Sequence, residues 1–363
     1  MKSLLVKVGQ QGSSVIFASK EQIVKTILGH KAYRGCNSYL IVCDTNVAPL
    51  FSHDDEHTLV LPAGEGAKNF SSINMILDRA LQMGLTRNSL FIGVGGGVIC
   101  DMCAFAASIY KRGAKLALVP TTLLSMVDAA IGGKTGIDFN GYKNQVGTFY
   151  PASLIVISID FLKSLPYNQY RSGLAEVIKS ALLHDKKLFS LLVNESAKIK
   201  KRDLELLQQV VVATIKVKAY YVERDFTEQN IRAHLNLGHT FAHALEAYYE
   251  CGKLENFISH GDAVAWGLLQ SNRLAQIFYS GFPKIVAHLK SEYKTLLSLL
   301  QTYEFPLNFK DVDSKKLLLA MRADKKNLDS KIRFVIQPKF FKTLVVKFNA
   351  KELDKFDFTI SEC

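Results

Sequence analysis

Apolar runs alternate with helix-like segments through the first 160 residues. Segments 71–84 and 103–113 place apolar residues at the spacing of amphipathic helices. The intervening runs are continuous and rich in β-branched residues, and they lie at 38–44, 57–64, 89–97, 115–122 and 153–160. Such strands alternating with helices are typical of a mainly parallel sheet covered on both faces. The pattern predicts a Rossmann-like α/β domain over residues 1–160.

After residue 160 the spacing of apolar residues becomes that of helices. Helical periodicity runs through 172–185, 203–225, 240–249 and 261–278, and one short strand pattern returns at 332–337. The stretch "SLPYNQYRSG" at 164–173 provides a loop near the change. We therefore predict a second, all-α domain over residues 161–363.

Length and cysteine usage favour a cytoplasmic protein. The chain has 363 residues, of which 48% are hydrophobic, and these suffice for two domains. No apolar stretch reaches the roughly 18 residues of a membrane span, and residues 1–14 resemble a short strand and turn more than a signal peptide. The six cysteines are scattered, as reduced thiols are. Cys100 and Cys103 have redox spacing, but no proline lies between them and no aromatic residue precedes them.

The net charge of +12 is compatible with binding to nucleic acid, to an acidic membrane surface or to a small anionic substrate. Basic clusters at 198–203 and 313–326 alternate with apolar residues at helical spacing, which predicts solvated helix faces. The chain has neither an RNA-binding aromatic signature nor a long basic tail. These features favour an anionic small molecule and predict no nucleic-acid partner.

The stretch "GVGGGVICD", residues 93–101, follows an apolar run and precedes a helical pattern. It fails the G-x-G-x-x-G pattern in both registers, because Val98 or Cys100 occupies the last glycine position. Glycines before a helix nevertheless let backbone N–H groups approach a pyrophosphate. A phosphate cradle and a tight glycine turn both remain open.

A second glycine stretch, "DAAIGGKT" at 128–135, ends like a P-loop. It lacks the first glycine of that motif, where Asp128 stands, so a nucleoside-triphosphate cradle is not indicated. Lys134 and Asp128 are instead candidates for a cation and a carboxylate facing one cleft, with Lys143 and Asn144 nearby in "GYKN". A solvent-exposed lysine is the alternative.

The segment "LNLGHTFAHALE", 235–246, is the strongest local pattern. If it is helical throughout, Asn236, His239, His243 and Glu246 form a polar stripe. Thr240 stands where a metalloprotease needs glutamate, so peptide hydrolysis is not indicated.

Additional metal ligands are available elsewhere. His260 begins another patterned helix, and Glu176 interrupts an apolar one. Two histidines with one carboxylate suit a zinc site with an open position. A structural histidine pair and an ordinary Glu176–Lys179 surface pair remain alternatives.

Several ordered blocks resemble the 3-dehydroquinate synthase family of sugar-phosphate cyclases. They are "GGGVICD", "YKRG", "VPTTLLSMVDAAIGGKTGID", "YKNQVGTFY", "GLAEVIKSALLHD", "LNLGHTFAHALE", "HGDAVAWG" and "MRADKK". The resemblance extends from about Asp44 to Phe334 and is far more specific than any one motif.

The resemblance implies a homodimer with an active site between an NAD-binding domain and a helical domain that holds Zn²⁺ or Co²⁺. The implied substrate is an anionic sugar phosphate, 3-deoxy-D-arabino-heptulosonate 7-phosphate, of the shikimate pathway. The product, 3-dehydroquinate, arises by transient oxidation with NAD, β-elimination of phosphate, re-reduction, ring opening and aldol closure. Neither nucleic acid nor membrane is implied as a partner.

The family's site residues are carried over by position. The implied metal ligands are Glu176, His239 and His260. The implied NAD contacts are Asp44, Ala63, Gly64, Glu65, Gly66, Ala67, Lys68, Gly96, Gly97, Val98, Ile99, Cys100, Asp101, Thr121, Thr122, Lys134, Lys143, Phe161, Leu162, Lys163 and Ser164. The implied catalytic and substrate residues are Arg112, Asp128, Lys134, Asn144, Lys179, Lys218, Arg232, Asn236, His243 and one or both of Lys325 and Lys326.

Four positions depart from the family pattern without removing a proposed ligand. Cys100 and Ala242 replace glycines, Asp262 replaces glutamate and Ser164 replaces threonine. A sister cyclase such as 2-deoxy-scyllo-inosose synthase is the nearest alternative, and it would accept a substrate without a carboxylate. A metal-dependent polyol dehydrogenase would instead accumulate NADH, and a nucleic-acid-binding protein would bind DNA or RNA in a salt-dependent way.

Overall fold

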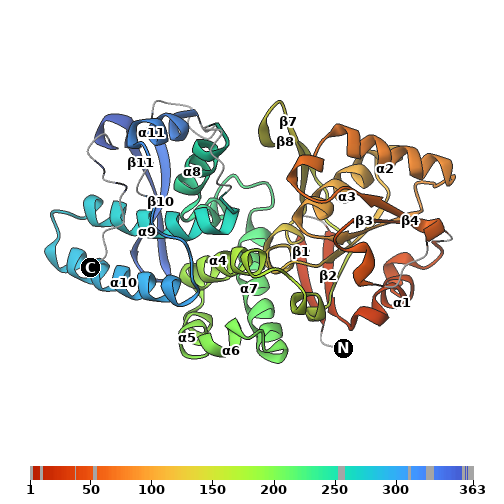
Figure 1. Cartoon of the computed structure of the whole chain (residues 1–363), viewed down its shortest axis with the longest axis horizontal. Helices are drawn as coiled ribbons and strands as arrows, with labels where there is room; N and C mark the ends of the chain where they lie inside the picture. Colours follow the sequence, from red (N-terminus) through yellow and green to blue (C-terminus); the bar gives the residue numbers. More distant parts are fainter. Residues whose placement is uncertain are drawn as a thin grey trace. The chain divides into compact units, whose positions relative to one another are not determined.

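The computed structural model describes residues 3–8, 11–36, 38–51, 55–251, 258–309, 312–323, 331–353, 356 and 358, which form two compact units (Figure 1). Unit 1 comprises Met1–Pro166 and Leu207–Thr227, and unit 2 comprises Tyr167–Leu206 and Glu228–Cys363. The first passage between units, from Pro166 to Tyr167, lies within the stretch 164–173 that was expected to be a loop, but that expectation was wrong beyond Pro166, because residues 167–173 are already helical. Segment 207–227, which the sequence places in the second domain, clusters with the first.

A seven-stranded sheet forms the core of unit 1, in the order β1-β2-β9-β6-β5-β3-β4. Its strands are β1 (Ser3–Val8), β2 (Gln11–Phe17), β3 (Tyr39–Asp44), β4 (Thr58–Leu61), β5 (Leu90–Gly95), β6 (Lys115–Pro120) and β9 (Leu154–Ile157). Only the β1–β2 pair is antiparallel. Every residue of β5 and β9 is buried, as continuous apolar strands in a covered sheet should be. The predicted mainly parallel sheet is confirmed.

Helices cover both faces of this sheet. In Figure 1, α2 (Phe70–Gln82) and α3 (Gly97–Ile109) lie on one side and α1 (Ile23–Leu28) on the other. Helix α7 (Leu204–Arg224) supplies most of the segment that joins unit 1 from later in the chain. Helix α3 begins earlier than its apolar pattern suggests, because the glycine loop itself forms the first turn.

A two-stranded antiparallel hairpin also belongs to unit 1, and the sequence analysis did not predict it. It consists of β7 (Lys134–Phe139) and β8 (Tyr142–Phe149). Its turn, Asn140–Gly141, has positive φ at both residues. Asn-Gly is the sequence pattern that most favours such hairpin turns, so the information was present in "DFNGYK".

Unit 2 is mainly helical, as predicted. Its helices are α4 (Tyr167–His184), α5 (Lys186–Asn194), α6 (Ser196–Lys200), α8 (His239–Cys251), α9 (His260–Phe278), α10 (Pro283–Thr302) and α11 (Ser314–Ala323). The strand expected at 332–337 lies within β10 (Lys331–Lys339), which pairs with β11 (Lys342–Asn349). This hairpin adds a small antiparallel sheet to the helical unit.

Close backbone contacts hold the central helices of unit 2 together. A Cβ on Gly261 would lie 2.3 Å from Ser172 Cα, so α9 touches α4 directly, and Ser172 Oγ accepts the Gly261 N–H at 3.0 Å. A Cβ on Gly267 would lie 2.2 Å from the Gly238 carbonyl oxygen, where α9 passes the start of α8. Helices α4 and α9 are buried on nearly all sides, so any charge they carry needs a partner.

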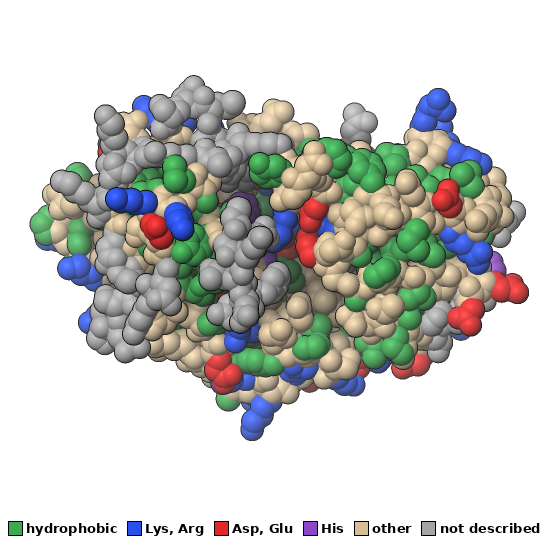
Figure 2. All heavy atoms as spheres, turned by 45° about the horizontal axis from the view of Figure 1, so that its top comes forward, with side chains coloured by type: hydrophobic (Ala, Val, Ile, Leu, Met, Phe, Trp, Pro, Cys, Tyr) green, Lys and Arg blue, Asp and Glu red, His purple; other side chains and the backbone are tan. Residues whose placement is uncertain are grey.

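Charged side chains are dispersed over the surface shown in Figure 2. Lys and Arg lie apart from one another on that face and form no continuous basic patch among the described residues. The described lysines of the two basic clusters include Lys198, Lys201, Lys315 and Lys316, which are exposed, as expected for solvated helix faces. Among the helices that the structure describes, none has both the length and the apolar character needed to cross a membrane.

We expect Gly261→Ala to lower the free energy of unfolding by about 1–3 kcal/mol, because the added methyl would force α9 away from Ser172. Gly281→Ala is the matched control, since no atom lies within 4 Å of its added Cβ. Denaturant unfolding of both variants measures the effect. Equal stability of the two variants would contradict the packing argument.

Candidate active site

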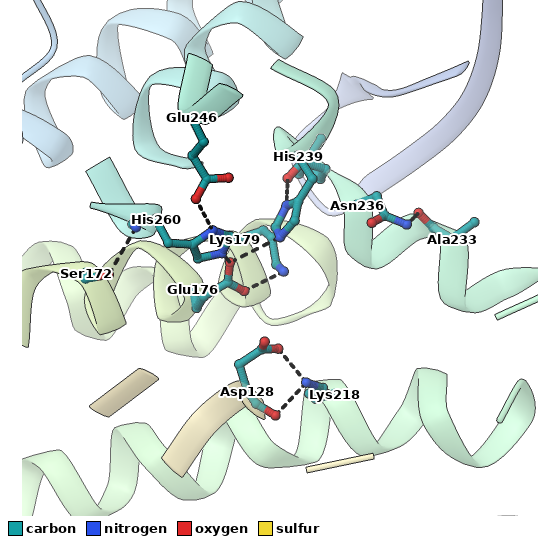
Figure 3. Close-up of polar contacts among 12 residues, drawn as sticks. Asp128, Ser172, Glu176, Lys179, Lys218, Ala233, Asn236, His239, Glu246 and His260 are labelled. Carbon is teal, nitrogen blue, oxygen red and sulfur yellow. Dashed lines mark hydrogen bonds and ion pairs between the residues drawn. The ribbon is translucent and has the colours of Figure 1, made fainter. Parts of the chain in front are cut away.

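Three residues from three helices converge in unit 2. Glu176 lies on α4, His239 at the start of α8 and His260 at the start of α9 (Figure 3). Their ligand atoms all lie within 4.8 Å of one another. Both histidine Nε2 atoms face the same carboxylate oxygen, Glu176 Oε1, at 3.5 Å from His239 and 3.6 Å from His260. The structure thus brings together the three residues that the sequence proposed as metal ligands.

The two imidazoles are oriented through their other nitrogens. His239 Nδ1 lies 3.2 Å from the Leu237 carbonyl oxygen, and His260 Nδ1 lies 3.2 Å from Glu246 Oε1. An oxygen acceptor at Nδ1 favours the tautomer that carries its proton there. The Nε2 lone pairs then point toward Glu176, as metal-binding histidines require.

Electrostatics suit these side chains to hold a cation. Burial alone would raise the pKa of Glu176, but Lys179 and His260 outweigh it and lower that pKa to about 2. Burial and the nearby Lys179 lower the pKa of His239 well below its usual range, which leaves a neutral imidazole. Burial would lower the pKa of His260 as well, but Glu176 and Glu246 raise it to about 10. The two carboxylates therefore favour a protonated His260 in the metal-free protein, and a bound cation would take the place of that proton.

One buried oxygen gives an independent test of fit to a metal. Glu176 Oε1 is buried and accepts no hydrogen bond in the described structure. A buried carboxylate oxygen without a partner is costly, and a divalent cation would satisfy it. One carboxylate and two imidazoles are a common ligand set of catalytic zinc, with a fourth position left open. The residues present fit a divalent metal.

Lys179 pairs with the other oxygen of the same carboxylate. Its Nζ lies 2.5 Å from Glu176 Oε2, and the two residues are 3% and 1% exposed. This excludes the alternative of an ordinary solvent-exposed i, i+3 pair. The ion pair leaves Oε1 as the atom that faces the histidines.

The polar stripe expected on one helix is shorter than predicted. Helix α8 begins at His239, because Gly238 adopts a φ of +80° that interrupts the helical path. His239, His243 and Glu246 therefore share α8, whereas Asn236 ends a preceding 3₁₀ turn, Ile231–Asn236.

That turn carries two of the proposed substrate-binding residues, Arg232 and Asn236. Arg232 is 2% exposed, and Asn236 Nδ2 donates to Glu228 Oε1 at 2.8 Å. Glu228 was not among the residues proposed from the sequence, where it stands in the unpatterned loop "DFTEQN". Its hydrogen bond to Asn236 reveals it.

In unit 1 the proposed cofactor residues share one edge of the sheet. They lie at the carboxyl ends of five parallel strands: Asp44 as the last residue of β3, 63–68 after β4, Gly96 to Asp101 after β5, Thr121 and Thr122 after β6, and 161–164 after β9. Lys134 and Lys143 lie instead in the β7–β8 hairpin. The chain runs from β3 outward to β4 and then returns to place β5 on the other side of β3. Ligands of open α/β sheets bind at such switch points. Asp44 and the glycine loop flank it.

The glycine loop combines both roles left open by its sequence. Gly93 and Gly95 are packing residues, because an added Cβ would lie 2.9 Å from Cys103 Cβ and 2.6 Å from Ile99 Cβ. Gly96 and Gly97 form the start of α3 and stay partly exposed, as does Val98. The strand side of the loop is thus a tight packing element. The helix side offers backbone N–H groups suited to a phosphate.

Lys68 links two proposed cofactor positions to one proposed substrate position. Its buried ammonium lies 2.8 Å from Asp101 Oδ2 and donates to Asn144 Oδ1 at 2.6 Å. Burial would lower the pKa of Lys68, but Asp101 and Glu65 raise it. The side chain therefore stays charged at the switch-point edge.

Other candidates in unit 1 lie on irregular backbone. Asp128 is in a short π-helix, Ser125–Ala129, and its carboxylate and carbonyl both accept from Lys218 Nζ on α7. Arg112 and Asn144 adopt positive φ of 65° and 53°. Such outliers persist where the surroundings impose them, and they cluster at functional sites.

Four lysines remain among the residues proposed from the sequence. Lys134 is exposed at the start of β7, and Lys143 is partly exposed in β8. Lys325 and Lys326 lie outside the described residues.

Comparison with known proteins identifies the family. Residues 58–172 match the family model "3-dehydroquinate synthase N-terminal", and residues 173–327 match "3-dehydroquinate synthase C-terminal". The chain belongs to the 3-dehydroquinate synthase family. A 3-dehydroquinate synthase of Helicobacter pylori strain G27 is 39% identical over 76% of each chain. One of Acidithiobacillus ferrooxidans strain ATCC 53993 is 35% identical over 93% of this chain and 92% of its own. The protein is an enzyme of this family.

Solved structures share the fold at lower identity. A 2-deoxy-scyllo-inosose synthase complexed with carbaglucose-6-phosphate, NAD⁺ and Co²⁺ has a TM-score of 0.82 and 20% identity, covering 97% of this chain and 99% of its own. A 2-epi-5-epi-valiolone synthase from Streptomyces hygroscopicus, with NAD⁺ and Zn²⁺ bound, has a TM-score of 0.78 and 24% identity, covering 98% and 97%. The expected dehydroquinate synthase-like fold is confirmed.

Removing a proposed ligand should weaken zinc binding at least about tenfold, since even residues that only support a ligand contribute that much. We expect Glu176→Ala and His260→Ala to lose bound zinc on dialysis and His243→Ala to keep it. Metal analysis by mass spectrometry measures the content. Full occupancy in the Glu176 variant would refute its role.

The C-x-x-C thiols should be inert, because both are buried and burial raises the pKa of Cys100 and Cys103 well above the ordinary value. In the folded enzyme we expect iodoacetamide to modify partly exposed Cys36 at least about tenfold faster. Peptide mass spectrometry gives the rates. Rapid modification of Cys100 or Cys103 would restore the redox interpretation.

Proposed function

We propose that the chain catalyses the reaction of its family, as a phosphate-eliminating carbon–oxygen lyase that depends on NAD and a divalent metal. The reaction converts 3-deoxy-D-arabino-heptulosonate 7-phosphate into 3-dehydroquinate plus phosphate, within the shikimate pathway. The observation that carries the proposal is the buried Glu176 oxygen with two histidine Nε2 atoms directed at it.

Glu176, His239 and His260 would hold the metal, and the switch-point edge of unit 1 would hold NAD. When bound, these groups supply reversible hydride removal and stabilisation of the developing oxyanion. NAD⁺ with Co²⁺ or Zn²⁺ in the two solved cyclases supports this assignment. The part-exposed N-terminus of α3 would bind pyrophosphate through backbone N–H groups, with Lys68 and Asp101 beside it.

The basic candidates suit a substrate that carries a phosphate and a carboxylate. Lys179 and Lys218 pair with Glu176 and Asp128 in the described structure, and a cation can bind a substrate anion while it keeps a carboxylate partner. We assign them, with Arg112, Lys134, Asn144, Arg232 and Asn236, to binding these anionic groups. Charge-assisted hydrogen bonds from this set would hold the phosphate in place and stabilise it as it departs.

His243 would donate a proton or hydrogen bond to the leaving phosphate. Its ring lies 5.5 Å from that of His239, centroid to centroid, one helical turn along α8. This places it next to the proposed metal site without making it a ligand in the described group. We also propose that the enzyme acts as a homodimer, which sedimentation or light scattering would test.

A sister cyclase reaction is the second candidate, because the solved structures with the fold include 2-deoxy-scyllo-inosose synthase. That likeness is at 20% identity and bears on fold alone. The 35–39% identity to curated 3-dehydroquinate synthases favours the main proposal. The substrate carboxylate distinguishes the two.

With the heptulosonate phosphate, NAD and zinc, we expect the purified enzyme to release phosphate without net NADH, because the hydride returns to the product. Phosphate release and absorbance at the NADH wavelength are followed together. Chelation should abolish release, and added zinc or cobalt should restore it.

Two controls separate the alternatives. A hexose phosphate without a carboxylate should give no phosphate release, whereas a sister cyclase would turn it over. NADH accumulation would indicate a polyol dehydrogenase. Absence of phosphate release at every metal condition would refute the proposal.

A further inference from the structure

Glu246 is a buried carboxylate that has no part in the proposed function as stated above. It lies on α8, two turns after His239, and is 8% exposed. Its Oε1 lies 3.2 Å from His260 Nδ1, on the side of the ring opposite Glu176 (Figure 3). His260 is thus held between two carboxylates, one at each ring nitrogen.

We propose that Glu246 is a positioning residue that orients His260 and strengthens its binding to the metal, an inference that rests on the metal site proposed above. A carboxylate can only accept at Nδ1, so it keeps the proton there and leaves the Nε2 lone pair directed at the metal position. Its negative charge also makes the imidazole a better donor. Carboxylate–histidine–metal arrangements act in this way.

The two histidines are supported differently, and this makes the role of Glu246 specific. His239 depends on a backbone carbonyl, that of Leu237, which carries no net charge. Only His260 depends on a side chain, and that side chain comes from α8, the helix that also carries His239. Glu246 therefore sets the position of one ligand from the helix of another.

The charges of the buried side chains also indicate that Glu246 strengthens metal binding. With His260 neutral, as metal binding requires, the two buried carboxylates Glu176 and Glu246 carry two negative charges, and Lys179 supplies one positive charge. A divalent cation at the three ligands would more than compensate for the remainder. Without Glu246 the same cation would enter a site with one fewer negative charge, which would weaken its electrostatic attraction to the site.

Glu292 provides a matched control within unit 2. It is a buried glutamate on α10, 9% exposed, which accepts from the Phe340 N–H at 2.7 Å and lies 3.1 Å from His288. It resembles Glu246 in burial and in its histidine neighbour, but that histidine is not a proposed ligand. Loss of its charge reports the general effect of removing a buried carboxylate.

The experiment measures the zinc dissociation constant by chelator competition in full-length wild type, Glu246→Gln, Glu246→Ala and Glu292→Gln. We expect Glu246→Gln to weaken zinc binding about tenfold and Glu246→Ala up to about 100-fold, with no change in Glu292→Gln. The absorption spectrum of the cobalt-substituted enzyme should shift in the Glu246 variants alone. Glu246→Gln conserves size and an acceptor oxygen, so it decides the question if the alanine variant fails to fold.

Wild-type zinc affinity in Glu246→Gln and Glu246→Ala would overturn the proposal. Equal losses in the Glu246 and Glu292 variants would also overturn it, because the effect would then be that of any buried carboxylate. These outcomes differ from failure of the proposed function, in which the wild-type enzyme itself binds no zinc or releases no phosphate.

Discussion

The chemistry of unit 2 depends on one constraint, the burial of the Glu176 carboxylate. A charge with almost no exposure to water must be compensated on both of its oxygens. Lys179 compensates one, and two histidines are directed at the other without satisfying it. The surrounding side chains keep the Glu176 carboxylate ionised and the His239 imidazole neutral, as a metal needs, whereas His260 would exchange a proton for the bound cation.

The packing of α4, α8 and α9 fixes the positions of the three proposed ligands. Glu176 lies one turn beyond Ser172, and His260 immediately precedes Gly261, so the backbone contact between those two helices fixes the separation of two ligands. The contact at Gly238 fixes the third ligand in the same way. Arg171 reinforces the first contact through a paired interaction with Asp262, at 2.9 Å for each of two hydrogen bonds. The shorter acid at position 262, a departure from the family pattern, is thus fully accommodated.

Much of the fold was predictable because its core strands are continuously apolar and its helices strongly periodic. The β7–β8 hairpin was not predicted, because its strands are half exposed and polar and lack a clear apolar pattern. The Asn-Gly turn was its main sequence signal. The three proposed ligands were found by resemblance and by the oddity of a glutamate in an apolar helix. Glu228 and the role of Glu246 could not be found in this way, since both depend on which side chains meet across elements distant in sequence. Spacing on one helix even misplaced Asn236, because Gly238 breaks that helix.

The return of residues 207–227 to unit 1 determines where the enzyme can be divided into fragments. The two family models meet between residues 172 and 173, inside α4 and directly at the Ser172 contact with Gly261. The structural units divide elsewhere, and unit 1 takes Leu207–Thr227 from beyond that junction. A fragment cut at the sequence junction would lack Lys218, the cation that neutralises Asp128, and Glu223, which accepts from the Lys7 N–H. The modules recognised by sequence therefore do not coincide with the compact units of the structure, and a cut between the modules would break contacts inside unit 1.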